Sequence, residues 1–518
     1  MPGLYSNKIQ HVVVLMFENR SFDHMLGGFP GVNGVLQKDG TVNPAFYNTM
    51  NPLKPADTST NPAVLPTVID LAGQSGLSHD FTHDFGDGMM LDLFGPGTSG
   101  YLDGAPLTPP ATTYPATGSG FVSTIATNVQ SWPPTPNGPS VMYFFEYGAP
   151  RIFHQLASEF VVCDNWHCDM PGHTKANRGF MHCATTGNLG IDDEAAGFQV
   201  NKTIFNEIEE YGLDWKMYTP TDAHIDSLWL EQIYGKPNAE APISEFCTDL
   251  ANGTLPFYSF IMCWSDGSTP ETDTSMHPAS HIEPGENYLA AIYNKLRSSP
   301  YWENTLLVVN FDENGGMYDH VPPPQTVPPD PTQPISTTFY QGDPTEYQFD
   351  FTLLGVRIPV LLISPWLSKG VIDSTQYQNT SILRYLEDLM VQPSNTILSL
   401  TQRDEKAPSI ATVFNQYGLD VMRTDCPENI PGYKGFPFGP GEPDICDPDA
   451  TKPTAEAMMQ PPMQHMVNVA NIYLAGLPGH PDSGKPITKT FATNAELSAY
   501  AKERKEAANK FFAEKNKK

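Results

Sequence analysis

The stretch Val12-Val13-Val14-Leu15-Met16-Phe17, followed directly by Glu18-Asn19, sets the expectation for the fold. An unbroken apolar run of this length is typical of a strand that is buried on both faces, as in a parallel sheet. We therefore expect one central sheet built from such segments. Comparable apolar runs occur at residues 160–163, 257–262, 306–309 and 360–363.

Helical patterns lie between and after these runs. Residues 286–298 and 381–390 carry apolar side chains at helical spacing, and Pro300 follows the first of them. Strands that alternate with helices predict an α/β fold with a mainly parallel central sheet flanked by helices. Residues 86–140 and 322–348 are rich in proline and small polar residues, which predicts long loop insertions.

The pattern changes after about residue 400. We expect a catalytic domain over residues 1–400 and an irregular extension over residues 401–518. The extension ends in a stretch with a capping box, Thr493 and Glu496, followed by apolar residues at helical spacing. This predicts an amphipathic C-terminal helix that packs on the body of the protein.

The charge balance excludes some partners. The net charge of −29, from 58 acidic and 29 basic residues, repels polyphosphate, so we expect no nucleic-acid partner. It also disfavours anionic lipid, so we expect at most transient contact with a membrane surface. Near the N-terminus no basic stretch precedes a long apolar run. This predicts a cytoplasmic location, with export by a non-classical route left open.

The chain has seven cysteines. No two of them have the spacing of a zinc site or a redox dithiol. Cys426 and Cys446 lie in a segment rich in proline, glycine and aspartate, so a disulfide between them is one possibility. An odd count leaves at least one cysteine unpaired.

Polar residues follow three of the expected strands. Glu18 and Asn19 follow the first, Asp312 and Glu313 follow the run at 306–309, and Thr174 lies beyond the run at 160–163. Ligands of open α/β sheets bind beyond the carboxyl ends of the strands. Oxygen ligands of this kind suit a divalent cation, and a cation lowers the pKa of a nearby hydroxyl and makes it a nucleophile.

Thr174 precedes an expected helix over residues 177–185, so its hydroxyl either caps that helix or attacks a substrate. A helix N-terminus offers backbone N–H groups to phosphate oxygens. Asn177 and Arg178 could add side-chain donors, which predicts that they bind substrate. A histidine could protonate a leaving alkoxide or hold a second cation. His277 and His320 flank the strand that carries Asp312, and His79 lies in a loop.

Three segments together resemble the bacterial phosphoesterase family of phosphatidylcholine-hydrolysing phospholipases C and related acid phosphatases. They are Glu18-Asn19-Arg20-Ser21-Phe22-Asp23, Gly172-His173-Thr174-Lys175-Ala176-Asn177-Arg178, and the stretch from Asp312-Glu313-Asn314-Gly315-Gly316 to Asp319-His320. The chain departs from the usual family pattern at His173 and Ala176, where the family has proline, and at Asn314, where it has histidine.

The resemblance implies an alkaline-phosphatase-like fold and a phosphothreonine intermediate. It implies that Thr174 is both nucleophile and metal ligand, and that histidines lie near the phosphate. The residues so implied are the metal ligands Glu18, Asn19, Thr174, Asp312 and Glu313, and the catalytic histidines His79, His277 and His320.

We therefore expect a metal-dependent phosphoesterase, with phospholipase C on phosphatidylcholine-type lipids as the first hypothesis. A broad-specificity acid phosphatase on the same site is the second, and a phosphate-ester-binding protein without turnover is the third. Zinc is the favoured metal, and calcium, manganese and iron remain open. The substrate is expected to be a phospholipid or a small phosphate ester. The sequence does not specify the oligomeric state.

Overall fold

The structure is a computed structural model. It describes a set of segments that together contain the central sheet and most of its helices. The described residues are 8–50, 56–57, 60–76, 89–94, 117–127, 138–187, 201–219, 230, 232–233, 236–239, 241–263, 271–278, 280–330, 336–340, 343–349, 351–390, 398–447 and 500.

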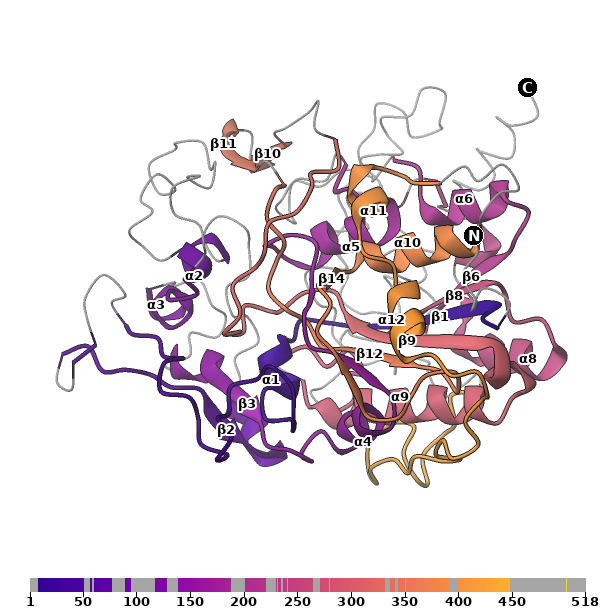
Figure 1. The fold of residues 1–518 in the computed structure, drawn as a ribbon, viewed down its shortest axis with the longest axis horizontal. Coiled ribbons are helices and arrows are strands. Elements are labelled where there is room, and N and C mark those ends of the chain that lie inside the picture. Colours follow the sequence, from indigo (N-terminus) through magenta and orange to yellow (C-terminus); the bar gives the residue numbers. More distant parts are fainter. Residues whose placement is uncertain are drawn as a thin grey trace.

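One eight-stranded sheet forms the centre of the molecule (Figure 1). In spatial order its strands are β13 (Val371–Asp373), β4 (Val161–Cys163), β12 (Val360–Ile363), β9 (Thr305–Phe311), β1 (His11–Phe17), β8 (Tyr258–Met262), β6 (Trp215–Thr219) and β7 (Ala241–Pro242). Five of them, β1, β4, β8, β9 and β12, follow the predicted apolar runs, and the sheet confirms the α/β fold with a mainly parallel sheet.

The orientation of β12 is the exception to the parallel pattern in this sheet. It pairs antiparallel with both of its neighbours, β4 and β9, whereas β1 pairs parallel with β8 and β9. Apolar runs of this kind do not encode direction, so a buried antiparallel strand and a buried parallel strand look alike in the sequence.

Helices cover both faces of the sheet. In Figure 1, α4 and α9 lie on one side of the strands, and α5, α10 and α6 lie on the other. The predicted helix at 286–298 begins earlier, at Ile282, and its first turn contains Pro284. A proline is tolerated in the first turn of a helix. The longer helices are α4 (Arg151–Glu159), α5 (Thr174–Cys183), α6 (Ile204–Glu210), α8 (Ile243–Asn252), α9 (Ile282–Arg297) and α10 (Thr380–Leu389).

Shorter elements surround this core. Three two-stranded sheets join β2 with β3, β5 with β14, and β10 with β11. None of the helices in the described segments is both long and apolar enough to cross a bilayer. The remaining elements are α1 (Phe22–Leu26), α2 (Met90–Phe94), α3 (Phe121–Thr127), α11 (Gln402–Lys406), α12 (Ala411–Tyr417), β2 (Thr67–Ile69), β3 (Tyr143–Phe145), β5 (Trp166–His167), β14 (Tyr377–Gln378), β10 (Ser336–Tyr340) and β11 (Asp343–Phe349).

The described part of the C-terminal extension packs on the main body. Ile410, Phe414, Ile430 and Ile445 are buried and belong to the same apolar core as the central strands. The predicted helix from Thr493 onward lies outside the described residues, apart from Tyr500, so its packing stays a prediction, as does the domain boundary at residue 400.

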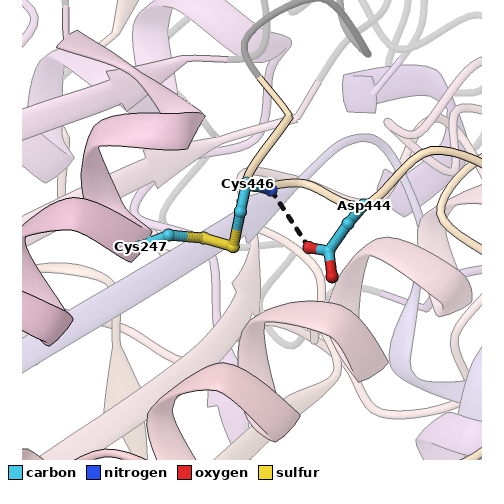
Figure 2. Close-up of side chains that lie close together, drawn as sticks. All are labelled: Cys247, Asp444 and Cys446. Atoms are coloured by element: carbon cyan, nitrogen blue, oxygen red, sulfur yellow. Dashed lines mark hydrogen bonds between the residues drawn. A yellow bond between two sulfur atoms is a disulfide. The ribbon is translucent and has the colours of Figure 1, made fainter.

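A disulfide fixes this extension to α8. It joins Cys247 to Cys446, and Figure 2 shows the bond beside Asp444, whose carboxylate accepts from the Cys446 backbone N–H at 3.0 Å. The pairing of Cys426 with Cys446, which the sequence left open as one possibility, does not form, and Cys426 is a buried free thiol. The true partner lies 199 residues away in sequence, a separation that cysteine spacing alone does not reveal.

Candidate active site

The neighbouring strands β1 and β9 end at the same level of the sheet, so the polar residues that follow them lie close together. Phe17 of β1 is in register with Phe311 of β9, so the residues that follow, Glu18 and Asp312, leave the sheet side by side. The Asn19 backbone N–H donates to Asp312 Oδ1 at 3.1 Å. Both carboxylates are buried, so the register of two strands brings two acidic side chains together at one edge of the sheet.

The turn after β9 approaches Asn19 closely. Asn19 has a left-handed backbone (φ 61), and Gly315 and Gly316 also have positive φ, as the expected sharp turn requires. A Cβ on Gly315 would lie 2.3 Å from the Asn19 carbonyl oxygen. Asn314, which stands where the resembled family has histidine, donates through Nδ2 to the Met317 carbonyl at 3.0 Å. Its side chain therefore holds the turn.

Thr174 is the first residue of α5. His173 is the N-cap residue of this helix, and its side chain makes no capping bond. The Thr174 hydroxyl instead donates to Asn19 Oδ1 at 3.2 Å. The half-buried hydroxyl is therefore aimed at the strand ends, at the positive end of the helix dipole.

Arg178 lies one turn further along α5 and is fully buried. Its guanidinium donates to Glu18 Oε1 at 3.0 Å and to Asp312 Oδ2 at 3.1 Å. Burial raises the pKa of Asp312, and the charge of Arg178 opposes that rise. The positive charge of Arg178 thus reduces the electrostatic repulsion between the buried carboxylates of Glu18 and Asp312. A bond from Arg178 to a substrate phosphate stays a prediction.

Asn177 is occupied by the turn that precedes Thr174. Its Oδ1 accepts from the Met170 N–H at 3.1 Å, and its Nδ2 donates to the carbonyls of Met170 at 3.2 Å and Gly172 at 3.0 Å. These contacts hold the backbone on which the Thr174 hydroxyl is presented. Substrate binding by Asn177 stays a prediction.

His277 joins the site through Asn19. His277 Nε2 lies 2.9 Å from Asn19 Nδ2. Because Asn19 Oδ1 accepts from Thr174, the Asn19 amide N–H₂ donates to His277 Nε2. The amide thus connects the imidazole to the hydroxyl, a geometry that brings a base or acid close to the expected nucleophile.

His320 belongs to a neighbouring cluster. Its Nδ1 donates to Asp23 Oδ2 at 2.7 Å, its Nε2 lies 3.2 Å from Asn33 Oδ1, and its ring stacks on Phe46. Burial alone would raise the pKa of Asp23, but the charges of His320 and Arg357 lower it. His79, the third histidine predicted, lies outside the described residues.

Two buried arginines beside the site were not predicted from the sequence. Arg357 donates to Asp23 Oδ1 at 3.1 Å and to Asp319 Oδ1 at 2.8 Å. Asp23, Asp319 and His320 are close enough to hold a cation, but the Arg357 guanidinium already supplies positive charge there. The sequence did contain a signal for Arg357, because it is a charged residue inside the apolar stretch 353–363. A charged residue in such a stretch is expected to be buried and paired with an opposite charge. The other is Arg20, beside Asn19.

Comparisons with known proteins place the chain among phosphoesterases. The model of a family described as the phosphoesterase family matches residues 9–390. Non-specific phospholipase C5 of Arabidopsis thaliana is 30% identical over 455 residues, which cover 83% of this chain and 78% of the relative. Phospholipase C B of Mycobacterium tuberculosis is 26% identical over 444 residues, covering 80% and 79%.

Two further matches are more partial. Non-hemolytic phospholipase C of Burkholderia pseudomallei is 27% identical over 428 residues, covering 73% of this chain and 55% of the relative. A solved structure of an alkaline phosphatase superfamily protein from Vibrio parahaemolyticus has a TM-score of 0.28 and 13% identity, covering 46% of this chain and 60% of the other.

Proposed function

Because the chain belongs to the phosphoesterase family and is therefore a phosphoric ester hydrolase, we propose that it is a metal-dependent phospholipase C that works through a phosphothreonine intermediate on Thr174. The observation that carries this proposal is the Thr174 hydroxyl, which sits at the start of α5 without capping it and bonds to Asn19 at 3.2 Å. A hydroxyl in that position is available for attack rather than used for structure.

The donor chemistry of the site fits a divalent cation. Oxygen atoms of Glu18, Asn19, Thr174, Asp312 and Glu313 would hold it, and oxygen sets of this kind suit calcium, manganese, iron or zinc. Such a cation would lower the pKa of the Thr174 hydroxyl and stabilise charge on the phosphoryl oxygens. The Thr174–Asn19 and Asn19–Asp312 bonds support a shared site for these residues.

The residues of the chain have distinct tasks in the proposed reaction. The Thr174 oxygen bonds to phosphorus as the bond from phosphorus to the glycerol oxygen breaks. The Thr174 hydroxyl releases its proton as its oxygen attacks, and the departing alkoxide takes up a proton from water. A catalytic role of His277 stays a prediction, because its Nε2 accepts from the Asn19 amide. Water then attacks the phosphothreonine, the headgroup phosphate leaves, and the threonine hydroxyl is restored. The N-terminal N–H groups of α5 stabilise the phosphate oxygens.

The names of the relatives support a phospholipid as the substrate. Relatives named phospholipase C match most of this chain. A phosphatidylcholine surface is zwitterionic, so the net charge of −29 does not oppose it, whereas an anionic surface would be repelled. We therefore propose phosphatidylcholine-type lipids as the substrate class and diacylglycerol as one product.

The test is a substrate panel with the metal-loaded protein. The panel contains phosphatidylcholine vesicles, a soluble phosphodiester and a phosphomonoester, and bound metal is measured by elemental analysis before and after dialysis against a chelator. We expect release of phosphocholine, loss of that release after chelation, and recovery on adding the metal back. Turnover of the monoester with none of the lipid would overturn the lipid assignment and favour the acid phosphatase.

Thr174→Ala and Thr174→Ser test the nucleophile. We expect Thr174→Ala to lose at least about a thousandfold in kcat, as removal of a nucleophile typically does, and Thr174→Ser to keep part of the activity because it keeps a hydroxyl. Intact-protein mass spectrometry after an acid quench should find a phosphocholine adduct in wild type treated with phosphatidylcholine and not in Thr174→Ala. Equal rates for Thr174→Ala and wild type would remove Thr174 from the mechanism.

A further inference from the structure

Arg403 of the C-terminal extension is bonded to the turn that precedes Thr174. Its side chain is buried, and its guanidinium donates to the Asp169 carbonyl at 2.6 Å and lies 3.4 Å from the Asp169 carboxylate. The same guanidinium lies over the ring of Phe180, with Cζ 4.6 Å from the ring centroid. One side chain of α11 therefore contacts both the turn before α5 and α5 itself.

This turn and the start of α5 form one hydrogen-bonded unit. The Met170 N–H donates to Asn177 Oδ1 at 3.1 Å, and Asn177 Nδ2 donates to the Gly172 carbonyl at 3.0 Å. These bonds join the backbone before Thr174 to the helix that begins at it. A shift of the backbone at Asp169 would therefore move Thr174 as well, because the bonded residues between them cannot absorb it.

Two arginines attach this unit to the rest of the molecule. Arg178, in α5, bonds to the carboxylates at the strand ends, and Arg403 bonds to the Asp169 carbonyl at the start of the unit. The Asp169 side chain is held as well, because its Oδ2 accepts from the Thr380 N–H at 2.9 Å. Thr174 lies between the two attachments in the sequence, so the direction of its hydroxyl depends on both.

Arg403 is itself held in one orientation by two further carbonyls. Its Nε donates to the Val327 carbonyl and its Nη2 to the Phe351 carbonyl, each at 2.6 Å. These carbonyls belong to two paired segments, because the Thr326 N–H donates to the Thr352 carbonyl at 2.8 Å. A planar guanidinium presents its donors in a rigid fork, so acceptors in three different segments fix its position.

We propose that Arg403 is a positioning residue, which fixes the Asp169 end of the turn and thereby aims the Thr174 hydroxyl at the phosphorus atom. The inference rests on the proposed function, in which Thr174 is the nucleophile. Attack on phosphorus needs the reacting atoms in line, and a misplacement of about 1 Å can cost about a hundredfold in rate. The extension would then complete the active unit, although the sequence marks it as a separate irregular region.

The kinetic test uses Arg403→Gln in the full-length, metal-loaded protein, with phosphatidylcholine vesicles and the p-nitrophenyl ester of phosphocholine as substrates. Glutamine cannot donate to three carbonyls at once. We expect kcat to fall about a hundredfold on both esters with little change in KM, because the nucleophile is misplaced while substrate binding is kept. Rates are compared at equal metal content, measured by elemental analysis. Arg403→Lys keeps the positive charge beside Asp169 but lacks the fork, so its kcat should lie between those of Arg403→Gln and wild type.

The chain offers a matched control in Arg423. This arginine also belongs to the extension, donates to the Glu159 carbonyl at 2.6 Å, and lies over the ring of Phe160, 5.4 Å from its centroid. Both partners precede β4, at the opposite edge of the sheet from the candidate site. Arg423→Gln and Arg403→Gln should each lower Tm, because each leaves a backbone carbonyl without its donor. Only Arg403→Gln should lower kcat.

A measurement without turnover tests the attachment directly. Hydrogen exchange, followed by mass spectrometry well below the Tm of each variant, reports on peptides that cover residues 168–180. We expect these peptides to exchange faster in Arg403→Gln, because the turn loses its attachment, and to exchange as in wild type in Arg423→Gln. Peptides from β1 and β9 should stay as slow as in wild type in both variants, which separates a local loss from general unfolding.

The outcomes separate the two proposals. If wild type cleaves neither ester, the proposed function fails, and hydrogen exchange alone decides whether Arg403 holds the turn. If wild type cleaves both esters, three results would each overturn the positioning role. They are an unchanged kcat in Arg403→Gln, an equal loss of kcat in Arg403→Gln and Arg423→Gln, and wild-type exchange of residues 168–180 in Arg403→Gln.

Discussion

At the scale of single residues, the contacts of the site converge on Asn19. Its backbone N–H bonds to Asp312, its side-chain oxygen accepts from Thr174, and its amide nitrogen donates to His277. These bonds require the left-handed backbone of Asn19 (φ 61), a conformation that asparagine tolerates better than most residues. A small shift of this one residue would therefore misalign three others.

Gly315→Ala should cause such a shift. The new Cβ would lie 2.3 Å from the Asn19 carbonyl oxygen, at a position whose φ is +63, so the methyl group must push Asn19 or the turn aside. We expect loss of most activity together with a lower Tm, measured by steady-state kinetics and thermal unfolding.

Gly435→Ala separates the clash from the backbone strain. Gly435 has a similar φ of +80, but nothing lies within 4 Å of the position that a methyl group would take there. This variant should lose about 1 kcal/mol of stability and keep wild-type kcat. Full activity in Gly315→Ala would show that the close approach to Asn19 is not needed.

At the scale of elements, α9 connects α4 to the C-terminal extension through a buried carboxyl. Glu286 accepts from the Phe153 N–H at 2.7 Å and lies 2.7 Å from the Tyr433 hydroxyl. Burial raises the pKa of Glu286 from 4.5 to about 7. Near neutral pH this side chain is therefore close to half protonated, which is rare for a glutamate.

Glu286→Gln should change how stability depends on pH. Between pH 4.5 and pH 7 the folded protein keeps a proton on Glu286 that the unfolded chain releases, so wild-type stability falls as pH rises through that window. Glutamine mimics the neutral form: its amide oxygen can accept from the Phe153 N–H, and its amide nitrogen can donate to the Tyr433 oxygen. We expect the variant to match wild type at pH 4.5 and to gain up to about 3 kcal/mol over it by pH 8.

Denaturant unfolding at a series of pH values measures this difference. Glu303→Gln is the control, because Glu303 is exposed and its replacement should leave the pH dependence unchanged. A constant difference between Glu286→Gln and wild type at all pH values would show that Glu286 is ionised in the folded protein.

The elements were more predictable than their connections. Apolar runs located β1, β4, β8, β9 and β12, because burial on both faces selects continuous apolar sequence. The same logic placed Glu18 and Asp312 at one edge. It could not predict that β12 runs antiparallel or that Arg178 pairs with Glu18, because direction and long-range pairing are set by tertiary packing. Arg20 belongs to no periodic pattern in the sequence, so its burial and its hydrogen bonds to the backbone carbonyls of residues 276, 277 and 280 are known only from the structure.

At the scale of the whole molecule, the Cys247–Cys446 disulfide attaches the extension to the sheet domain. Structural disulfides persist where thiols are kept oxidised. We therefore propose that the chain works in an oxidising compartment, which favours the export route over the cytoplasm. The five other cysteines are buried free thiols and are shielded from exchange.

Cys446→Ser should lower the stability of the whole chain. A cross-link over a long loop contributes about 2–5 kcal/mol, mainly by restricting the unfolded chain. We expect Cys446→Ser to lower Tm and to be insensitive to reductant, whereas reductant should lower the Tm of wild type to the level of the variant. Cys426→Ser is the control and should keep the response to reductant. A wild-type Tm that ignores reductant would argue against the bond.

The same bond has a topological consequence. It closes a covalent ring from Cys247 to Cys446 that contains His277, Asp312 and Glu313, whereas Glu18, Asn19 and Thr174 precede the ring. A single peptide-bond cut inside the ring would leave the two fragments joined, with one apparent mass until the sulfurs are reduced. A pulling force applied at the two ends of the chain would bypass the ring through the sulfur bridge. The part of the candidate site inside the ring would thus stay attached after a nick and would be spared tension, whereas the part before Cys247 would have neither protection.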